Sequence, residues 1–175
     1  MKQTDKTNKT NLILKEIKKA LSGISKRKTK KLVNEIAKAN EVNVIGHGRS
    51  WHAGKSFAMR LTHLGLDVGR LGKKPGKTSN KDLTLIISGS GESKDILKLV
   101  KSVKKGKIVC ITMTGSDDSS IAKKADLVIE IKARRSKQPL RSLFEQSALI
   151  YLDSIVMLLM EKMNISEKEM WKRHD

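Results

Sequence analysis

The segment 85-LIISGSGES-93 joins a run of apolar residues to a turn built of small and hydroxylated residues. The apolar run that ends at Ser88 has the character of a buried parallel strand, and the apolar spacing from Ile96 to Val103 is helical. A strand that ends in such a turn and continues as a helix presents backbone N–H groups and hydroxyls to one point. The segment therefore predicts a phosphate site, although an ordinary strand-to-helix turn with Ser93 as helix N-cap has the same pattern.

A second junction of the same kind occurs earlier in the chain. The apolar strand expected at residues 41–45 runs into Gly46-His47-Gly48-Arg49-Ser50, and a helix should follow. Trp51 stands where the dinucleotide-binding pattern requires its third glycine, so a Rossmann dinucleotide site is not predicted. Ser50 fits the N-cap of the helix and could supply a second phosphate hydroxyl. Arg49 could pair with a phosphate or a carboxylate, or remain a solvated loop arginine.

The order of elements predicts an α/β fold with a parallel sheet covered on both faces by helices. Two amphipathic helices within residues 1–40 precede the first strand, and we assign them to the same domain as residues 41–175. Ligands bind at the carboxyl ends of the strands in such folds, and both Ser/Gly junctions lie at that edge. Strands are expected at residues 41–45, 66–71, 82–88, 107–112 and 126–131.

Composition restricts the classes of protein to which the 175-residue chain can belong. One cysteine, Cys110, lies in an apolar run, which excludes a disulfide framework and predicts a buried, inert thiol. Neither a signal peptide nor an uninterrupted transmembrane run is recognisable, so we expect a cytoplasmic protein with no membrane association. The net charge of +19 would suit nucleic acid or anionic metabolites. Aromatics are only 3% and no nucleic-acid motif is present, so a lysine-rich solvated surface is favoured and nucleic acid is not an expected partner.

A long helix expected at Leu143–Met163 is apolar nearly all round. Glu145, Asp153 and Glu161 interrupt it, which argues against a membrane span. Such a helix should be buried on more than one side, against the sheet and against a partner subunit. Glu145 follows the arginine-rich loop 133–142 and could act as a general base, or as a solvated first-turn glutamate that favours the helix dipole.

Three runs of sequence resemble one family. They are VIGHGRSWHAGKSFAMRLTHLGLDV at residues 44–68, DLTLIISGSGES at 82–93, and SLFEQSALIYLDSIVMLLMEKMNISEKEMWKRH at 142–174. These runs are similar to the sugar isomerase (SIS) domain and, more narrowly, to the 6-phospho-3-hexuloisomerases. The Ser-Gly-Ser-Gly-Glu-Ser motif alone indicates only a SIS domain, whereas its combination with the first and third runs is much narrower.

The resemblance implies a three-layer, flavodoxin-like fold with a five-stranded parallel sheet, assembled as a homotetramer. It also implies interconversion of D-arabino-3-hexulose 6-phosphate and D-fructose 6-phosphate through an enediolate, with neither metal nor organic cofactor. Another SIS-type phosphosugar isomerase and a non-catalytic SIS regulator are the alternatives. Residues 1–40 show no clear helix-turn-helix, which counts against a transcriptional regulator.

The family's site residues are carried over position by position. Glu145 falls at the candidate base, and His174, from an adjacent subunit, could move a proton between the two substrate oxygens. The relatives usually carry Thr-Pro where this chain has Lys74-Pro75, at the substrate edge. The positions that fall in the phosphate-binding segments are Gly48, Arg49, Ser50, Ser88, Gly89, Ser90, Gly91 and Ser93.

Overall fold

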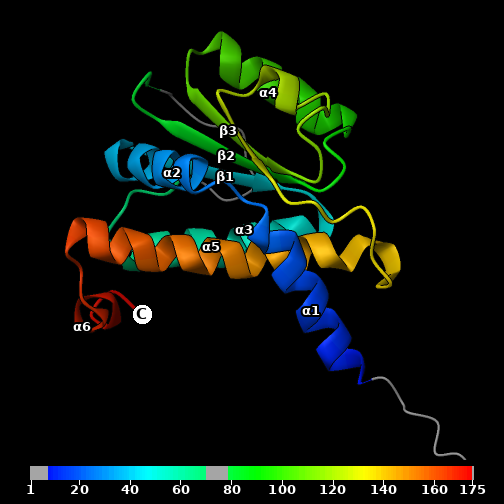
Figure 1. The fold of residues 1–175 in the computed structure, drawn as a ribbon. Helices are drawn as coiled ribbons and strands as arrows, with labels where there is room; N and C mark the ends of the chain where they lie inside the picture. Colours follow the sequence, from blue (N-terminus) through cyan, green and yellow to red (C-terminus); the bar gives the residue numbers. More distant parts are fainter. Residues whose placement is uncertain (1–7, 70–78, 175) are drawn as a thin grey trace, which may run out of the picture.

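A computed structural model describes residues 8–69 and 79–174, and in it a parallel sheet lies between two layers of helices (Figure 1). The strand order is β1-β2-β3-β4, and every neighbouring pair is parallel. Gly46 at the end of β1 pairs with Ile87, so the carboxyl ends of β1 and β2 lie side by side. The predicted three-layer α/β fold is confirmed. The strands are β1 (Val42–Gly46), β2 (Leu83–Ser88), β3 (Val109–Thr114) and β4 (Leu127–Glu130).

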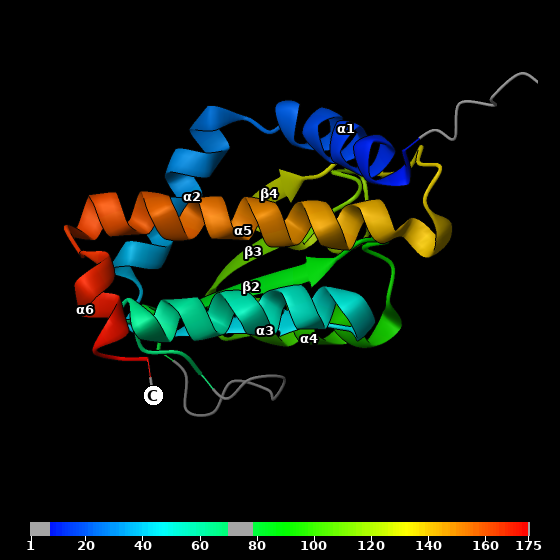
Figure 2. The same ribbon diagram turned by 90° about the horizontal axis from the view of Figure 1, so that it is seen from below.

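The helices divide between the two faces of the sheet. One face is covered by α4 (Lys94–Lys105) with the short η1 (Ala122–Lys124) beside it. The other is covered by α5 (Ser142–Met163), with α3 (Gly48–His63) along one of its flanks and α1 (Lys9–Ser22) and α2 (Lys26–Lys38) along the other (Figure 2). The loop before α5 contains η2 (Pro139–Arg141), and α6 (Glu167–Trp171) follows α5.

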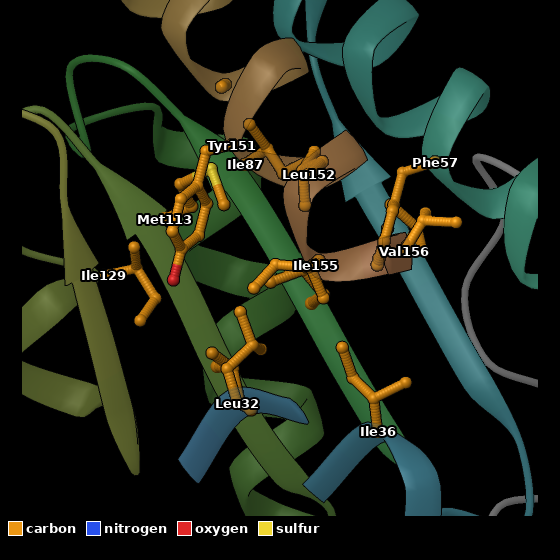
Figure 3. Packing of buried hydrophobic residues seen from close by; sticks show 14 of the residues in the cluster. Leu32, Ile36, Phe57, Ile87, Met113, Ile129, Tyr151, Leu152, Ile155 and Val156 are labelled. Carbon is orange, nitrogen blue, oxygen red and sulfur yellow. The ribbon is translucent and has the colours of Figure 1, made fainter. Parts of the chain in front are cut away.

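Strand alternation sends side chains into two separate cores. On the α5 face, Ile87 and Met113 of the sheet pack with Leu32 of α2 and Ile155 of α5, all fully buried (Figure 3). On the α4 face, a smaller cluster includes Ile86 and the buried Cys110. The N-terminal helices contribute Ile17, Ala20, Leu32, Val33 and Ile36 to the larger core.

The prediction of five strands is wrong for the described residues, which form four. The strand expected at 66–71 is reduced to one parallel bridge between Val42 and Val68. The Val42 N–H donates to the Asp67 carbonyl (2.9 Å), and the Gly69 N–H donates to the Val42 carbonyl (3.2 Å). Aspartate and glycine are poor strand residues and flank Val68, so within residues 66–69 a single bridge forms. Residues 70–71 and Lys74 lie outside the described residues.

The start of α3 also differs from the prediction. The helix begins at Gly48 with His47 as its N-cap, so Ser50 lies inside the first turn and is not the cap. Gly48 has φ +53°, a conformation that glycine adopts without strain, and this lets the chain turn into the helix earlier than expected. Ser93 occupies the N-cap position of α4, without a side-chain cap hydrogen bond, and Ser166 caps α6 in a capping box with Glu169.

Helix α5 runs from Ser142 to Met163, one residue longer than predicted. By length and composition, Pro139–Met163 is apolar enough to cross a membrane, yet half of its most apolar window is buried inside the fold, as in a core helix. Its sheet-facing side is buried. Its other side remains open in the single chain, where the exposed fractions are 44% for Ile150, 64% for Met157 and 37% for Leu158.

Candidate functional site

The ends of β1 and β2, together with the start of α5, enclose a cavity of about 300 Å³. The β1–α3 junction supplies Ser50, the β2–α4 junction supplies three further serines, and α5 supplies Glu145. The structure thus brings together the four serines and the glutamate that the sequence singled out. The walls consist of His47, Ser50, Ile87, Ser88, Gly89, Ser90, Ser93, Leu140, Arg141, Phe144 and Glu145.

The serine-rich turn between β2 and α4 has the character of an anion site. The Gly91 N–H donates to Ser88 Oγ (3.3 Å), and the Glu92 N–H donates to Ser90 Oγ (3.3 Å). Each hydroxyl therefore uses an acceptor position in the turn and keeps its own O–H proton to donate to a ligand. Ser93 starts α4, whose N-terminal N–H groups and dipole favour a negative group at this point.

Gly91 makes this turn possible. Its φ is +67°, and a Cβ at this position would lie 2.3 Å from Ser119 Oγ, so no other residue fits without displacement. Its backbone carbonyl accepts a hydrogen bond from the Ile121 N–H (3.2 Å), while the Gly115 N–H donates to the Gly89 carbonyl (3.1 Å). These bonds fasten the turn to the segment that follows β3, which fixes the serine hydroxyls in place.

Glu145 reaches the cavity from the first turn of α5, with its side chain only 16% exposed. Arg49 Nε lies 3.6 Å from Glu145 Oε1, and Arg49 Nη1 donates to Ser142 Oγ (3.0 Å). Of the alternatives for Arg49, the structure therefore shows a carboxylate partner. The second carboxylate oxygen, Glu145 Oε2, is buried and has no hydrogen-bond partner among the described residues. A fixed, nearly buried carboxylate with one uncommitted oxygen can take a proton from a bound ligand.

His174 lies far from this cavity in the single chain. It follows α6, with its ring centroid 4.8 Å from that of His63 and 4.9 Å from that of Trp171. At about 1.5 Å rise per residue, α5 separates Glu145 from Met163 by about 27 Å. Figure 2 shows α6 and the first turns of α5 at opposite ends of the molecule. The structure therefore does not bring His174 to Glu145 within one chain.

The described residues also address metal binding and thiol chemistry. Over residues 8–69 and 79–174, no group of three or more His, Cys, Asp or Glu side chains is placed to hold a metal ion.

Burial raises the pKa of the Cys110 thiol to about 12, and the neighbouring Asp126 carboxylate adds to the effect. A thiol with that pKa stays protonated and unreactive. The predicted buried, inert cysteine is confirmed.

Two polar residues of the cavity wall were not among the predicted site residues. His47 directly follows β1, and the rule that ligands bind at the carboxyl ends of strands would have found it. Arg141 lies four residues before Glu145, in a loop that the sequence marked only as basic. Nothing in the spacing of that loop shows which of its arginines faces the cavity, because the direction depends on an irregular turn.

Comparison with known proteins identifies the family. The SIS domain model matches residues 35–155. A 3-hexulose-6-phosphate isomerase from Methanocaldococcus jannaschii is 35% identical over 153 residues, covering 85% of this chain and 83% of that protein. One from Bacillus subtilis is 33% identical over 174 residues, 93% of each. The chain belongs to the SIS domain family.

A solved structure agrees with this assignment. The crystal structure of a hypothetical protein from Methanococcus jannaschii, described as inferring a 3-hexulose-6-phosphate isomerase function, has a TM-score of 0.86. It is 31% identical, and the match covers 95% of this chain and 97% of that one. The predicted resemblance to the hexuloisomerases, and with it the class of enzyme, an isomerase, is confirmed.

Proposed function

We propose that this isomerase interconverts D-arabino-3-hexulose 6-phosphate and D-fructose 6-phosphate. One observation carries the proposal: the carboxylate of Glu145 lines the same 300 Å³ cavity as Ser50, Ser88, Ser90 and Ser93. A phosphate held by the serines and the start of α4 would fix one end of the sugar. The carbonyl end of the substrate would then lie within reach of the carboxylate. The names of the M. jannaschii and B. subtilis relatives support the particular substrate.

The reaction needs only proton transfers. Glu145 takes the proton from carbon 2 of the 3-ketose, and an enediolate forms across carbons 2 and 3. The same carboxylic acid returns the proton to carbon 3, while a hydroxyl proton moves from oxygen 2 to oxygen 3, so the carbonyl ends at carbon 2. No electron leaves the substrate. One C–H bond breaks at carbon 2 and one C–H bond forms at carbon 3. General acid–base catalysis of this kind contributes about 10²- to 10⁴-fold.

The transfer between the two oxygens requires a second group. We assign it to His174 from another copy of the chain, because His174 lies at the far end of α5 in its own chain. The exposed apolar side chains Ile150, Met157 and Leu158 on α5, and Met59 on α3, offer a surface for such a copy. We propose a homotetramer, and sedimentation velocity of the purified chain measures the assembly state.

A coupled assay tests the function. D-arabino-3-hexulose 6-phosphate is supplied, and fructose 6-phosphate is followed through glucose 6-phosphate oxidation. We expect turnover that requires no added metal or cofactor. If turnover is absent but fructose 6-phosphate raises the melting temperature, the substrate is another phosphosugar or the chain is a regulator. If neither effect occurs, the serine cavity is not a sugar-phosphate site.

A further inference from the structure

Arg141 belongs to the wall of the serine cavity, and its side chain is exposed to solvent. It also lines an adjoining cavity of about 500 Å³, with which the serine cavity shares Gly89 and Ser90. Arg141 therefore stands where the two spaces meet. Among the described residues that line the serine cavity, Arg141 alone carries a permanent positive charge, since the others are apolar, hydroxylated, a histidine and Glu145.

The backbone of Arg141 has an unusual conformation. Its φ is +62°, and that of Leu140 is +52°, in the left-handed region that favours glycine. Strained backbone of this kind persists where surrounding contacts determine it, and it gathers at functional sites. Here Ser142 supplies the contacts, because its hydroxyl donates to the Pro139 carbonyl (2.8 Å) and accepts from Arg49 Nη1 (3.0 Å).

The middle of the basic loop is fastened by α1. Glu16 accepts hydrogen bonds from Ser136 Oγ (2.7 Å), the Lys137 N–H (2.9 Å) and Gln138 Nε2 (3.0 Å). These hydrogen bonds lower the pKa of Glu16, with the bond from the Lys137 backbone contributing most. The backbone of the loop is thus fastened on both sides of Arg141, at residues 136–138 and at Ser142.

We propose that Arg141 is a substrate-binding residue that contacts the phosphate group of the ligand. A phosphate ester carries a charge of about −1.5 to −2 near neutral pH, and the carboxylate of Glu145 in the same cavity repels it. Arg49 pairs with Glu145 from outside the cavity lining and offsets part of that repulsion, and the serines, being neutral, cannot offset the remainder. A guanidinium offsets it and forms paired hydrogen bonds with phosphate oxygens. Arg141 thereby sets the preference for phosphorylated over neutral sugars. The inference rests on the proposed function, which supplies the identity of the sugar.

Arg141→Gly is the informative variant, because glycine is relaxed at φ +62°. Binding of inorganic phosphate and of fructose 6-phosphate is measured by titration calorimetry. We expect the Kd of both probes to rise about 10- to 100-fold, as for loss of charge-assisted hydrogen bonds. We also expect KM to rise while kcat changes little, because binding of ground and transition states weakens together. The melting temperature without ligand should stay equal or rise.

Arg135→Ala is the matched control. It removes the same charge from the same loop, but Arg135 lines a different cavity, beside Asp117 and Glu130. Its Kd should stay within about twofold of wild type. Equal Kd values for Arg141→Gly and wild type would overturn the inference, as would an equal loss in the control. If Arg141→Gly does not fold, Arg141→Asn carries the same test, since asparagine tolerates the left-handed region.

The inference and the proposed function fail in different ways. Lack of hexulose turnover by the wild type contradicts the function, while the ratio of the two Kd values still decides the role of Arg141. A wild type that binds neither inorganic phosphate nor fructose 6-phosphate overturns both.

Discussion

The two ends of α5 carry different chemistry. At its first turn, Glu145 is 16% exposed, pairs with Arg49 and faces four serines across a small cavity. Beyond its last turn, His174 is exposed and lies beside His63 and Trp171, near a cavity of about 560 Å³. The first end has the parts for binding an anion and taking a proton from carbon. The second has two imidazoles and no serine among the residues that line its cavity, so within one chain the proposed base and His174 lie apart.

The largest effect is expected from removing the carboxylate of Glu145 at the first turn of α5. Glu145→Gln keeps the shape of the side chain and removes the base, so kcat in the coupled assay should fall about 10²- to 10⁴-fold. Calorimetric affinity for inorganic phosphate should not weaken, because the serines are untouched and a repelling charge is gone.

Glu161→Gln is a suitable control for this variant. It removes a carboxylate from the same helix at an exposed position, and kcat should remain close to that of wild type. Normal turnover by Glu145→Gln would remove Glu145 as the base and would leave the cavity as a binding site only.

The next prediction tests whether Glu145 of one copy and His174 of another copy form one site. His174→Ala alone should lower kcat about 10²-fold if it moves the proton between the substrate oxygens. Mixing it with Glu145→Gln under conditions that exchange subunits should restore activity, because some sites then combine an intact Glu145 with an intact His174.

The outcome of mixing is decisive for that arrangement. With random exchange and a site shared by two chains, about a quarter of the sites in an equal mixture would contain both native residues, since each residue is native in half of the copies. Activity equal to the mean of the two separate variants would mean that no site combines residues from two chains.

The strand-to-helix junctions show how much the sequence can predict. The apolar run ending at Ser88 and the small residues after it indicated a buried strand, a tight turn and a helix N-cap, and all three are present. Because the carboxyl ends of parallel strands lie at one edge of the sheet, Ser50 and Ser88 were expected at the same edge, where the structure has them. Each of these inferences depends on local sequence and on the constant geometry of parallel strands.

The sequence failed where the structure depends on a few residues of irregular backbone. Ser50 was assigned as N-cap, but His47 holds that position, three residues earlier, because Gly48 turns the chain there. A strand was assigned around Val68, but its neighbours end the pairing after one bridge. The direction of Arg141 follows from two left-handed residues that no periodic pattern encodes. The roles proposed for Glu145 and His174 came from the family resemblance, because spacing alone left them open.

A smaller effect tests whether the serines at the first end of α5 bind the phosphate. Ser90→Ala removes one hydroxyl from the phosphate cradle, so binding of fructose 6-phosphate should weaken by about 1–3 kcal/mol. Ser102→Ala, at an exposed position in the last turn of α4, should leave the affinity unchanged. Unchanged affinity for Ser90→Ala in calorimetry would place the phosphate elsewhere in the cavity.

The smallest expected effect concerns the second end and its response to pH. Burial lowers the pKa of His63, and the neighbouring His174 and Arg60 add to the shift. The unfolded chain therefore takes up the proton at a higher pH than the folded chain does. The stability that this histidine contributes is present above its usual pKa of about 6.5 and is lost as the pH falls from there toward the folded value.

The melting temperature should drop between pH 7 and pH 5 by more in wild type than in His63→Gln. Parallel pH profiles of the two proteins would mean that His63 is as free to protonate in the folded chain as in the unfolded one. Within one chain His63 lies at the opposite end of α5 from the serines, so phosphate affinity at pH 7 should be the same in both proteins. A difference would show that the two ends are coupled, within the chain or between copies.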